Sequence, residues 1–124
     1  MKWGLLFLGG GVGAVARYAL GLWIEARVGP GFPWGTFAIN VGGCLAIGVV
    51  ATLADEHLWI SPPARLLLVT GLLGGFTTFS TFGLETWQLF EEGRAGLALA
   101  YGGASLFAGL AAVGLAVRLT RELL

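Results

Sequence analysis

The chain has 124 residues, of which 56% are hydrophobic and 11% are charged, and its net charge is zero. A soluble domain carries about a quarter charged residues, so this composition excludes a soluble globular fold and indicates an integral membrane protein. Neutrality also leaves no basic surface for nucleic acid, and the single cysteine, Cys44, excludes an internal disulfide. We expect Cys44 to act as a small buried hydrophobic residue.

Four apolar segments are long enough to cross a membrane, which takes about 20 residues. They cover residues 3–23, 36–54, 66–87 and 95–117, and the connectors combine charge with proline or glycine. The first run continues through Leu22 without a cleavage region, so we interpret it as a retained span. The tryptophans fall near span ends, as in an aromatic belt: Trp3, Trp23, Trp34, Trp59 and Trp87. These features predict one all-α transmembrane domain over residues 1–124.

Four spans place both termini on one side of the membrane. Two cationic residues, Arg27 and Arg94, lie on the opposite side, and the terminal side carries Lys2, Arg65, Arg118 and Arg121. This difference is a weak orientation signal under the positive-inside rule. Two interpretations stay open: both termini are cytoplasmic, or the protein inserts in both orientations.

The first span combines small residues with one charged residue. Gly9 and Gly13 are spaced for close helix packing. Arg17 lies deep in the apolar run, where an arginine is costly unless it is paired or extends to the interface. We expect Arg17 to face the bundle interior or a vestibule, with simple extension to the surface as the alternative.

The second and fourth spans each carry isolated polar side chains. Asn40 is the single strongly polar residue of the second span, and it either bridges two helices or donates its amide to an anion. In the fourth span, Tyr101, Ser105 and Gly109 recur every fourth residue and form one stripe. A serine in a membrane helix often bonds to its own backbone, so this stripe alone indicates little.

The third span contains the most unusual stretch, GLLGGFTTFSTF at Gly71–Phe82. Its glycine pair, Gly74 and Gly75, weakens the helix, and hydroxyl residues and phenylalanines crowd the positions that follow. We expect a broken helix, which is tolerated at membrane depth only where protein buries it or it lines a watery cavity. Freed carbonyls suit a cation, whereas hydroxyls, amides and the positive edges of aromatic rings suit an anion. The alternative is a kinked helix whose phenylalanines only pack.

Catalytic chemistry is missing from the sequence. The only histidine, His57, lies in a connector beside Asp55 and Glu56, and no catalytic motif can be assembled. We therefore predict that the protein is not an enzyme. The interiors of the first three spans carry no carboxylate, which argues against a proton-coupled exporter. Glu85 lies near the end of the third span, where it suits the mouth of a pathway.

Three motifs in order resemble the Fluc (CrcB) family of fluoride channels over essentially the whole chain. They are G-x-G-A-x-x-R-Y at Gly11–Tyr18, G-T-F-x-x-N-x-x-G at Gly35–Gly43 and GGFTTFSTF at Gly74–Phe82. The resemblance implies an antiparallel, dual-topology homodimer in the cell (inner) membrane, with two pores that passively export fluoride and relieve its toxicity. A small proton-coupled transporter and a non-conducting assembly subunit are the alternatives.

The resemblance also implies roles for particular residues. The fluoride pore would be lined by Asn40, Phe79, Phe82, Ser80, Thr81, Tyr101 and Ser105. Arg17 would lie near a vestibule and Glu85 near a pore mouth. The backbone carbonyls of Gly74 and Thr77, doubled by the dimer axis, would hold a structural Na+. Gly109 lacks the hydroxyl expected at this position in some relatives, which leaves the length of the polar track open.

Overall fold

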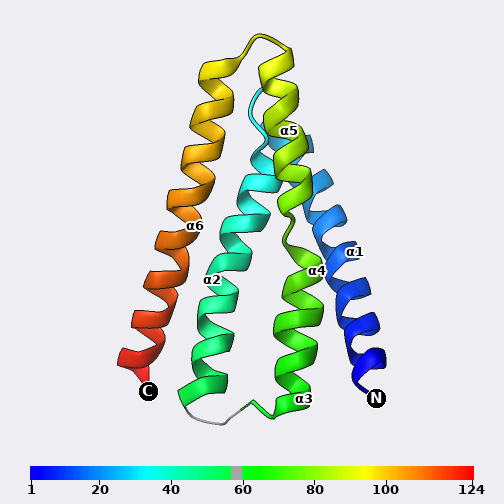
Figure 1. The fold of residues 1–124 in the computed structure, drawn as a ribbon, viewed down its shortest axis with the longest axis vertical. Helices are drawn as coiled ribbons and strands as arrows, with labels where there is room; N and C mark the ends of the chain where they lie inside the picture. The colour runs from blue at the N-terminus through cyan, green and yellow to red at the C-terminus, as the bar shows by residue number, and fades with distance from the viewer. Residues whose placement is uncertain (57–59) are drawn as a thin grey trace.

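The computed structural model describes residues 1–56 and 60–124, so His57 and Trp59 lie outside the described residues. Within this part of the chain, four helices are long and apolar enough to cross a membrane (Figure 1). They are α1 (Lys2–Val28), α2 (Trp34–Glu56), a composite third helix over residues 62–91 and α6 (Ala95–Leu123). The predicted all-α fold with a broken third helix is confirmed, and both termini lie at the same end of the bundle (Figure 1).

The helices extend beyond the predicted apolar spans because their charged ends remain helical. In α1 the last turn includes Arg27, whose positive charge favours the carboxyl end of a helix. The helix then ends at Gly29, which has a φ of 73° that few other residues adopt without strain.

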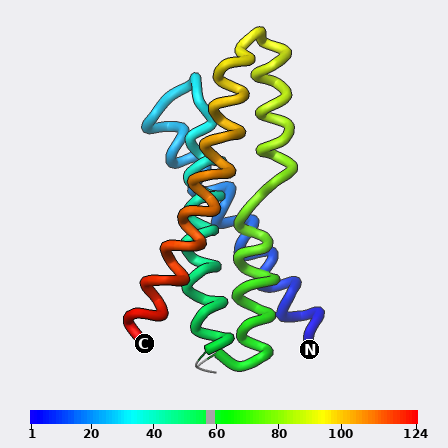
Figure 2. Tube along the Cα trace, turned by 60° about the vertical axis from the view of Figure 1, so that its left-hand side comes forward, coloured from blue at the N-terminus to red at the C-terminus, as the bar shows by residue number. Residues whose placement is uncertain are grey.

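The third helix is built from four pieces. It begins after Ser61, whose Oγ accepts a hydrogen bond from the Ala64 amide at 3.4 Å, and two prolines occupy its first positions. The pieces are α3 (Pro62–Arg65), the π-helical η1 (Leu66–Leu73), α4 (Gly74–Phe76) and α5 (Phe79–Glu91). Figure 2 shows the chain running straight between α4 and α5.

The position of the break differs from the one suggested by the glycine pair. Gly74 and Gly75 remain helical, whereas Thr77 and Thr78 are extended, with ψ angles of 161° and 120°. The glycines serve close packing instead: a Cβ at Gly75 would collide with the carbonyl oxygen of Gly10 in α1. The break falls where a side chain from α2 engages the backbone, as described below.

Contact between α1 and the first half of the third helix depends on glycine. A Cβ at Gly9 would lie 2.7 Å from the Leu67 carbonyl oxygen and 3.0 Å from the Gly71 Cα. A Cβ at Gly13 would collide with the Leu72 carbonyl. The predicted packing role of these residues is therefore confirmed, since backbone approaches backbone here with no side chain between.

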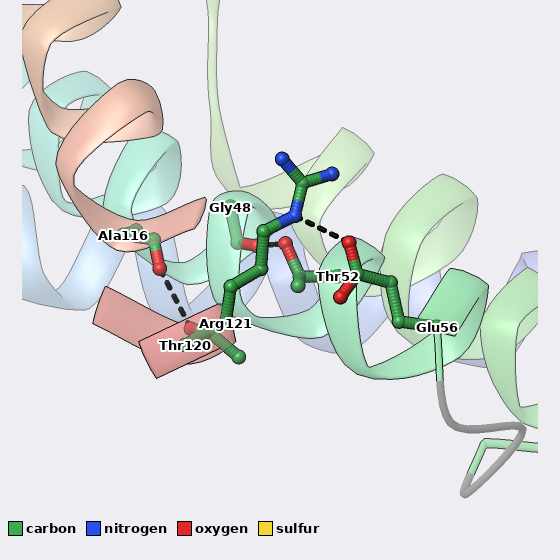
Figure 3. A network of polar contacts seen from close by, with 6 residues as sticks. All are labelled: Gly48, Thr52, Glu56, Ala116, Thr120 and Arg121. Atoms are coloured by element: carbon green, nitrogen blue, oxygen red, sulfur yellow. Dashed lines mark hydrogen bonds and ion pairs between the residues drawn. The ribbon is translucent and has the colours of Figure 1, made fainter. Parts of the chain in front are cut away.

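The second pair of helices, α2 and α6, is also tightly packed. A Cβ at Gly48 would lie 2.7 Å from the Ala116 Cβ. At the end near the termini, Arg121 of α6 forms an ion pair with Glu56 of α2 (Figure 3). Thr52 and Thr120 direct their hydroxyls to carbonyls of their own helices, both at 2.7 Å (Figure 3).

Candidate ion pathway

Asn40 holds the broken backbone of the third helix. Its Nδ2 donates to the Thr78 carbonyl at 2.9 Å, and its Oδ1 accepts from the Thr78 amide at 2.8 Å. One side chain therefore satisfies both polar groups of a residue that has left the helix. Asn40 thus bridges two helices, which was one of the two roles that the sequence suggested for it.

The break in the third helix releases carbonyls from the helical pattern, among them those of Gly74 and Thr77. In a continuous helix the Thr78 amide would donate to the Gly74 carbonyl, but it donates to Asn40 instead. The Thr81 amide, which would pair with the Thr77 carbonyl, donates to Thr78 Oγ1 at 3.2 Å. The carbonyls of Gly74 and Thr77 have therefore lost their helical donors, and unpaired backbone carbonyls at a broken helix are suitable ligands for Na+.

Arg17 contacts the same break from α1. Its Nε donates to the Gly75 carbonyl at 3.2 Å, and the residue is only partly buried. The carboxyl end of a helix carries partial negative charge, so this position favours a guanidinium. Arg17 therefore has a partner within the bundle, although it does not line either cavity described below.

A cavity of about 430 Å³ lies beside the break. Its wall brings together several residues that sequence analysis singled out: Asn40, Gly74, Thr77, Phe79, Phe82 and Ser105. The Phe79 and Phe82 rings are tilted by 46°, with centroids 5.6 Å apart. Phe79 is 83% exposed on the single chain, so most of this ring is open to whatever adjoins it.

Ser105 differs from the other hydroxyl residues of the helices. Its Oγ is buried, and it has no hydrogen-bond partner among the residues that the structure describes. Thr52, Thr86 and Thr120 all bond to a carbonyl four residues earlier. Buried hydroxyls are rarely left unpaired, so a free hydroxyl on the wall of a cavity points to a ligand there.

Tyr101 and Glu85 form a second polar group beyond Phe82. Tyr101 is fully buried, its ring centroid lies 5.0 Å from that of Phe82, and its hydroxyl donates to Glu85 Oε2 at 2.7 Å. Thr36 donates to the other carboxylate oxygen at 2.8 Å. Glu85 also lines a second cavity of about 390 Å³, together with Glu25 and Arg94 near the connectors. Tyr101 itself lines neither cavity.

Two predicted pore residues, Ser80 and Thr81, do not line the first cavity. Ser80 is exposed on the single chain, and the Thr81 hydroxyl lies 3.1 Å from the Thr78 hydroxyl. The roles of Thr36 and Thr78 were not predicted from the sequence. Each had a signal: Thr36 lies one helical turn before Asn40, and Thr78 has the hydroxyl preferred directly before a helix begins.

Comparison with known proteins places the chain among relatives. A family model described as "CrcB-like protein, Camphor Resistance (CrcB)" matches residues 4–117. The chain belongs to the CrcB family. The resemblance carried by the three motifs is therefore confirmed, and this CrcB chain is a multi-pass membrane protein.

Three relatives, each named "Fluoride-specific ion channel FluC", illustrate the similarity. The relative from Acidobacterium capsulatum is 50% identical over 91% of this CrcB chain and 90% of its own. That from Chloroflexus aurantiacus is 51% identical over 92% and 90%. That from Solibacter usitatus is 49% identical over 98% and 100%. Their name describes a non-enzymatic function, in agreement with the prediction from the sequence.

Proposed function

We propose that this CrcB chain forms a fluoride-selective channel that exports F− passively across the cell membrane and relieves its toxicity. The observation that carries the proposal is the first cavity, whose wall joins the unpartnered Ser105 hydroxyl, the Asn40 amide and the Phe79–Phe82 ring pair. The names of the relatives support the same ion.

The chemistry of the cavity suits a small anion that must lose its water. Dehydration is costly unless other donors replace the solvent. Ser105 supplies a hydroxyl donor, and the Asn40 amide has two N–H groups, of which one is bonded to Thr78. The ring edges of Phe79 and Phe82 add weak positive potential without fixing the ion, which conduction requires. Tyr101, Ser80 and Thr81 extend this polar track in our proposal.

We propose further that the channel is an antiparallel, dual-topology homodimer with two pores. Four helices are too few to enclose a pore comfortably, and the exposed ring of Phe79 suits a wall completed by a second copy. A two-fold axis would bring four carbonyls, two each from Gly74 and Thr77, around one structural Na+. The loss of their helical donors supports this assignment. Arg17 would lie near a vestibule and Glu85 near a pore mouth.

Fluoride efflux from liposomes tests the function. Purified protein is reconstituted into liposomes that contain fluoride and chloride. The membrane potential that opposes anion efflux is then dissipated, and an ion electrode follows the release of each anion. We expect rapid fluoride loss with chloride retained and without a proton gradient. Flux that needs a proton gradient would favour the small transporter, and no flux from folded protein would favour the non-conducting subunit.

A further inference from the structure

Cys44 fills the gap that Gly109 leaves in the polar stripe of α6. Tyr101, Ser105 and Gly109 occupy successive turns, and Gly109 has no donor to offer. A Cβ built at Gly109 would lie 3.3 Å from Cys44 Sγ. The sulfur therefore occupies the space that a side chain at position 109 would take, and both residues line the first cavity.

The surroundings of Cys44 are those of a ligand site. Cys44 lies one helical turn beyond Asn40 on α2, and Ser105 lies one turn before Gly109 on the facing helix α6. All four residues line the same cavity. The unpartnered Ser105 hydroxyl is independent evidence that this wall receives a hydrogen-bond acceptor. A thiol is a weak donor of the same kind.

We propose that Cys44 is a fluoride-contacting residue, whose S–H supplies the donor that Gly109 cannot. This proposal rests on the proposed channel function and extends it by one contact. The sequence prediction treated Cys44 only as a small buried hydrophobic residue. The cavity adds a polar role, because the sulfur borders open space rather than only packed side chains.

A substitution cycle tests whether the thiol acts as a donor. In reconstituted liposomes, Cys44→Ala should slow fluoride efflux by about two- to tenfold, the range that one neutral hydrogen bond spans. Cys44→Ser should keep at least the wild-type rate, and Gly109→Ser should restore efflux when added to Cys44→Ala. Gly109→Ser alone should reduce efflux, because its Cβ meets the sulfur. Equal efflux from wild type and Cys44→Ala, with the same thermal stability, would overturn the proposal.

Thiol modification gives a second measurement. A residue that only packs would not be protected from the reagent by fluoride. Methyl methanethiosulfonate attaches a methylthio group to the thiolate as a disulfide and releases methanesulfinate. We expect it to block wild-type efflux, and we expect fluoride to slow the modification more than chloride does. Cys44→Ala should resist the reagent. A protein that stays unmodified, or that conducts fully after modification, would contradict the proposal.

The matched control is Leu124→Cys in the Cys44→Ala background. Leu124 is 41% exposed, lies beyond the apolar part of α6 and does not line the cavity, so a thiol there should be modified from water without effect on efflux. A block in this control as well would overturn the assignment to position 44. Failure of the proposed function is distinct, because it would appear as absent fluoride efflux from the unmodified wild type.

Discussion

At the scale of residues, a single amide holds the backbone at the break in the third helix. Asn40 reaches from α2 and pairs with both the amide and the carbonyl of Thr78. Because these groups lie in an apolar bundle, an unpaired backbone would be costly there. Asn40 is therefore structural and, in our proposal, also a fluoride donor through its second N–H.

We predict that Asn40→Ala lowers the free energy of unfolding by about 2–6 kcal/mol. It leaves the amide and the carbonyl of Thr78, both partly buried, without partners, at about 1–3 kcal/mol each. Thermal or denaturant unfolding in detergent measures the loss. The control is Gln88→Ala, which removes an exposed amide and should change stability little. Equal stability of the two variants would show that the Thr78 pairing is dispensable.

We predict that Phe79→Ile strongly slows fluoride efflux while the protein remains folded. Isoleucine keeps much of the apolar bulk but has no ring edge with positive potential. Phe107→Ile is the control, because Phe107 is 71% exposed on α6 and lies outside the cavity. Efflux is compared in liposomes after gel filtration has established the same assembly state. An unchanged rate in folded Phe79→Ile protein would remove this residue from the pore.

At the scale of elements, the helices pack as two pairs, and in each pair glycine allows the helices to approach closely. One pair is α1 with the first half of the third helix, and the other is α2 with α6. The Asn40–Thr78 pairing, together with the close approach of Gly43 to Thr77, joins α2 to the break in the third helix beside the cavity. The spacing of the helices around the cavity therefore depends on glycines, which have no side chain to hold the helices apart.

Gly13→Ala tests this spacing, with Gly11→Ala as its control on the same helix. A Cβ at Gly13 would collide with the Leu72 carbonyl and lie 2.8 Å from the Phe76 amide nitrogen, whereas nothing lies within 4 Å of one at Gly11. We expect Gly13→Ala to destabilise the protein by about 1–3 kcal/mol through overpacking. Gly11→Ala should be neutral or stabilising by up to about 1 kcal/mol. Thermal unfolding in detergent compares them, and equal effects would contradict the close approach.

Sequence patterns predicted the elements better than their junctions. Hydropathy and connectors revealed the four helices, and the crowded Gly/Thr/Phe stretch revealed that the third one breaks. The site of the break was displaced to Thr77 and Thr78, because a side chain 38 residues earlier determines it. The Tyr101–Glu85 contact was likewise beyond local patterns, since it joins two helices through the geometry of their packing. Ser80 and Thr81 were placed by resemblance alone and remain predictions as pore residues.

Charge distribution at the scale of the whole molecule bears on orientation. Among the basic residues at the terminal end, Arg65 pairs with Asp55 at 2.8 Å and Arg121 pairs with Glu56. These acidic partners offset part of the positive charge at that end. Insertion in both orientations requires the two ends of the bundle to carry similar charge. The positive-inside rule counts mainly the cationic residues.

We predict that Glu122→Lys with Leu124→Lys drives the chain into a single orientation. Both substitutions add positive charge at the terminal end, and an antiparallel dimer then cannot form, so fluoride efflux should fall sharply. Protease access to a C-terminal tag in sealed vesicles reports orientation. Lys2→Gln with Glu91→Lys should bias the opposite orientation and serves as the partner variant.

Coexpression of the two oppositely biased variants should restore efflux, because each supplies the orientation that the other lacks. Full efflux from either variant alone, in one orientation, would contradict the antiparallel dimer. The control is coexpression of two copies of the same biased variant, which supplies the same amount of protein in one orientation only.

The pairing of Asn40 with Thr78 also bears on how the chain is made. Synthesis proceeds from the N-terminus, so α2 is complete before the ribosome reaches the break, and the amide is present when Thr78 arrives. A partner for both groups of Thr78 is therefore already synthesised when the extended residues reach the bilayer, where unpaired peptide groups would be costly. A chain with the same segments permuted, so that the third helix emerged before its partner, would lose this advantage during biogenesis.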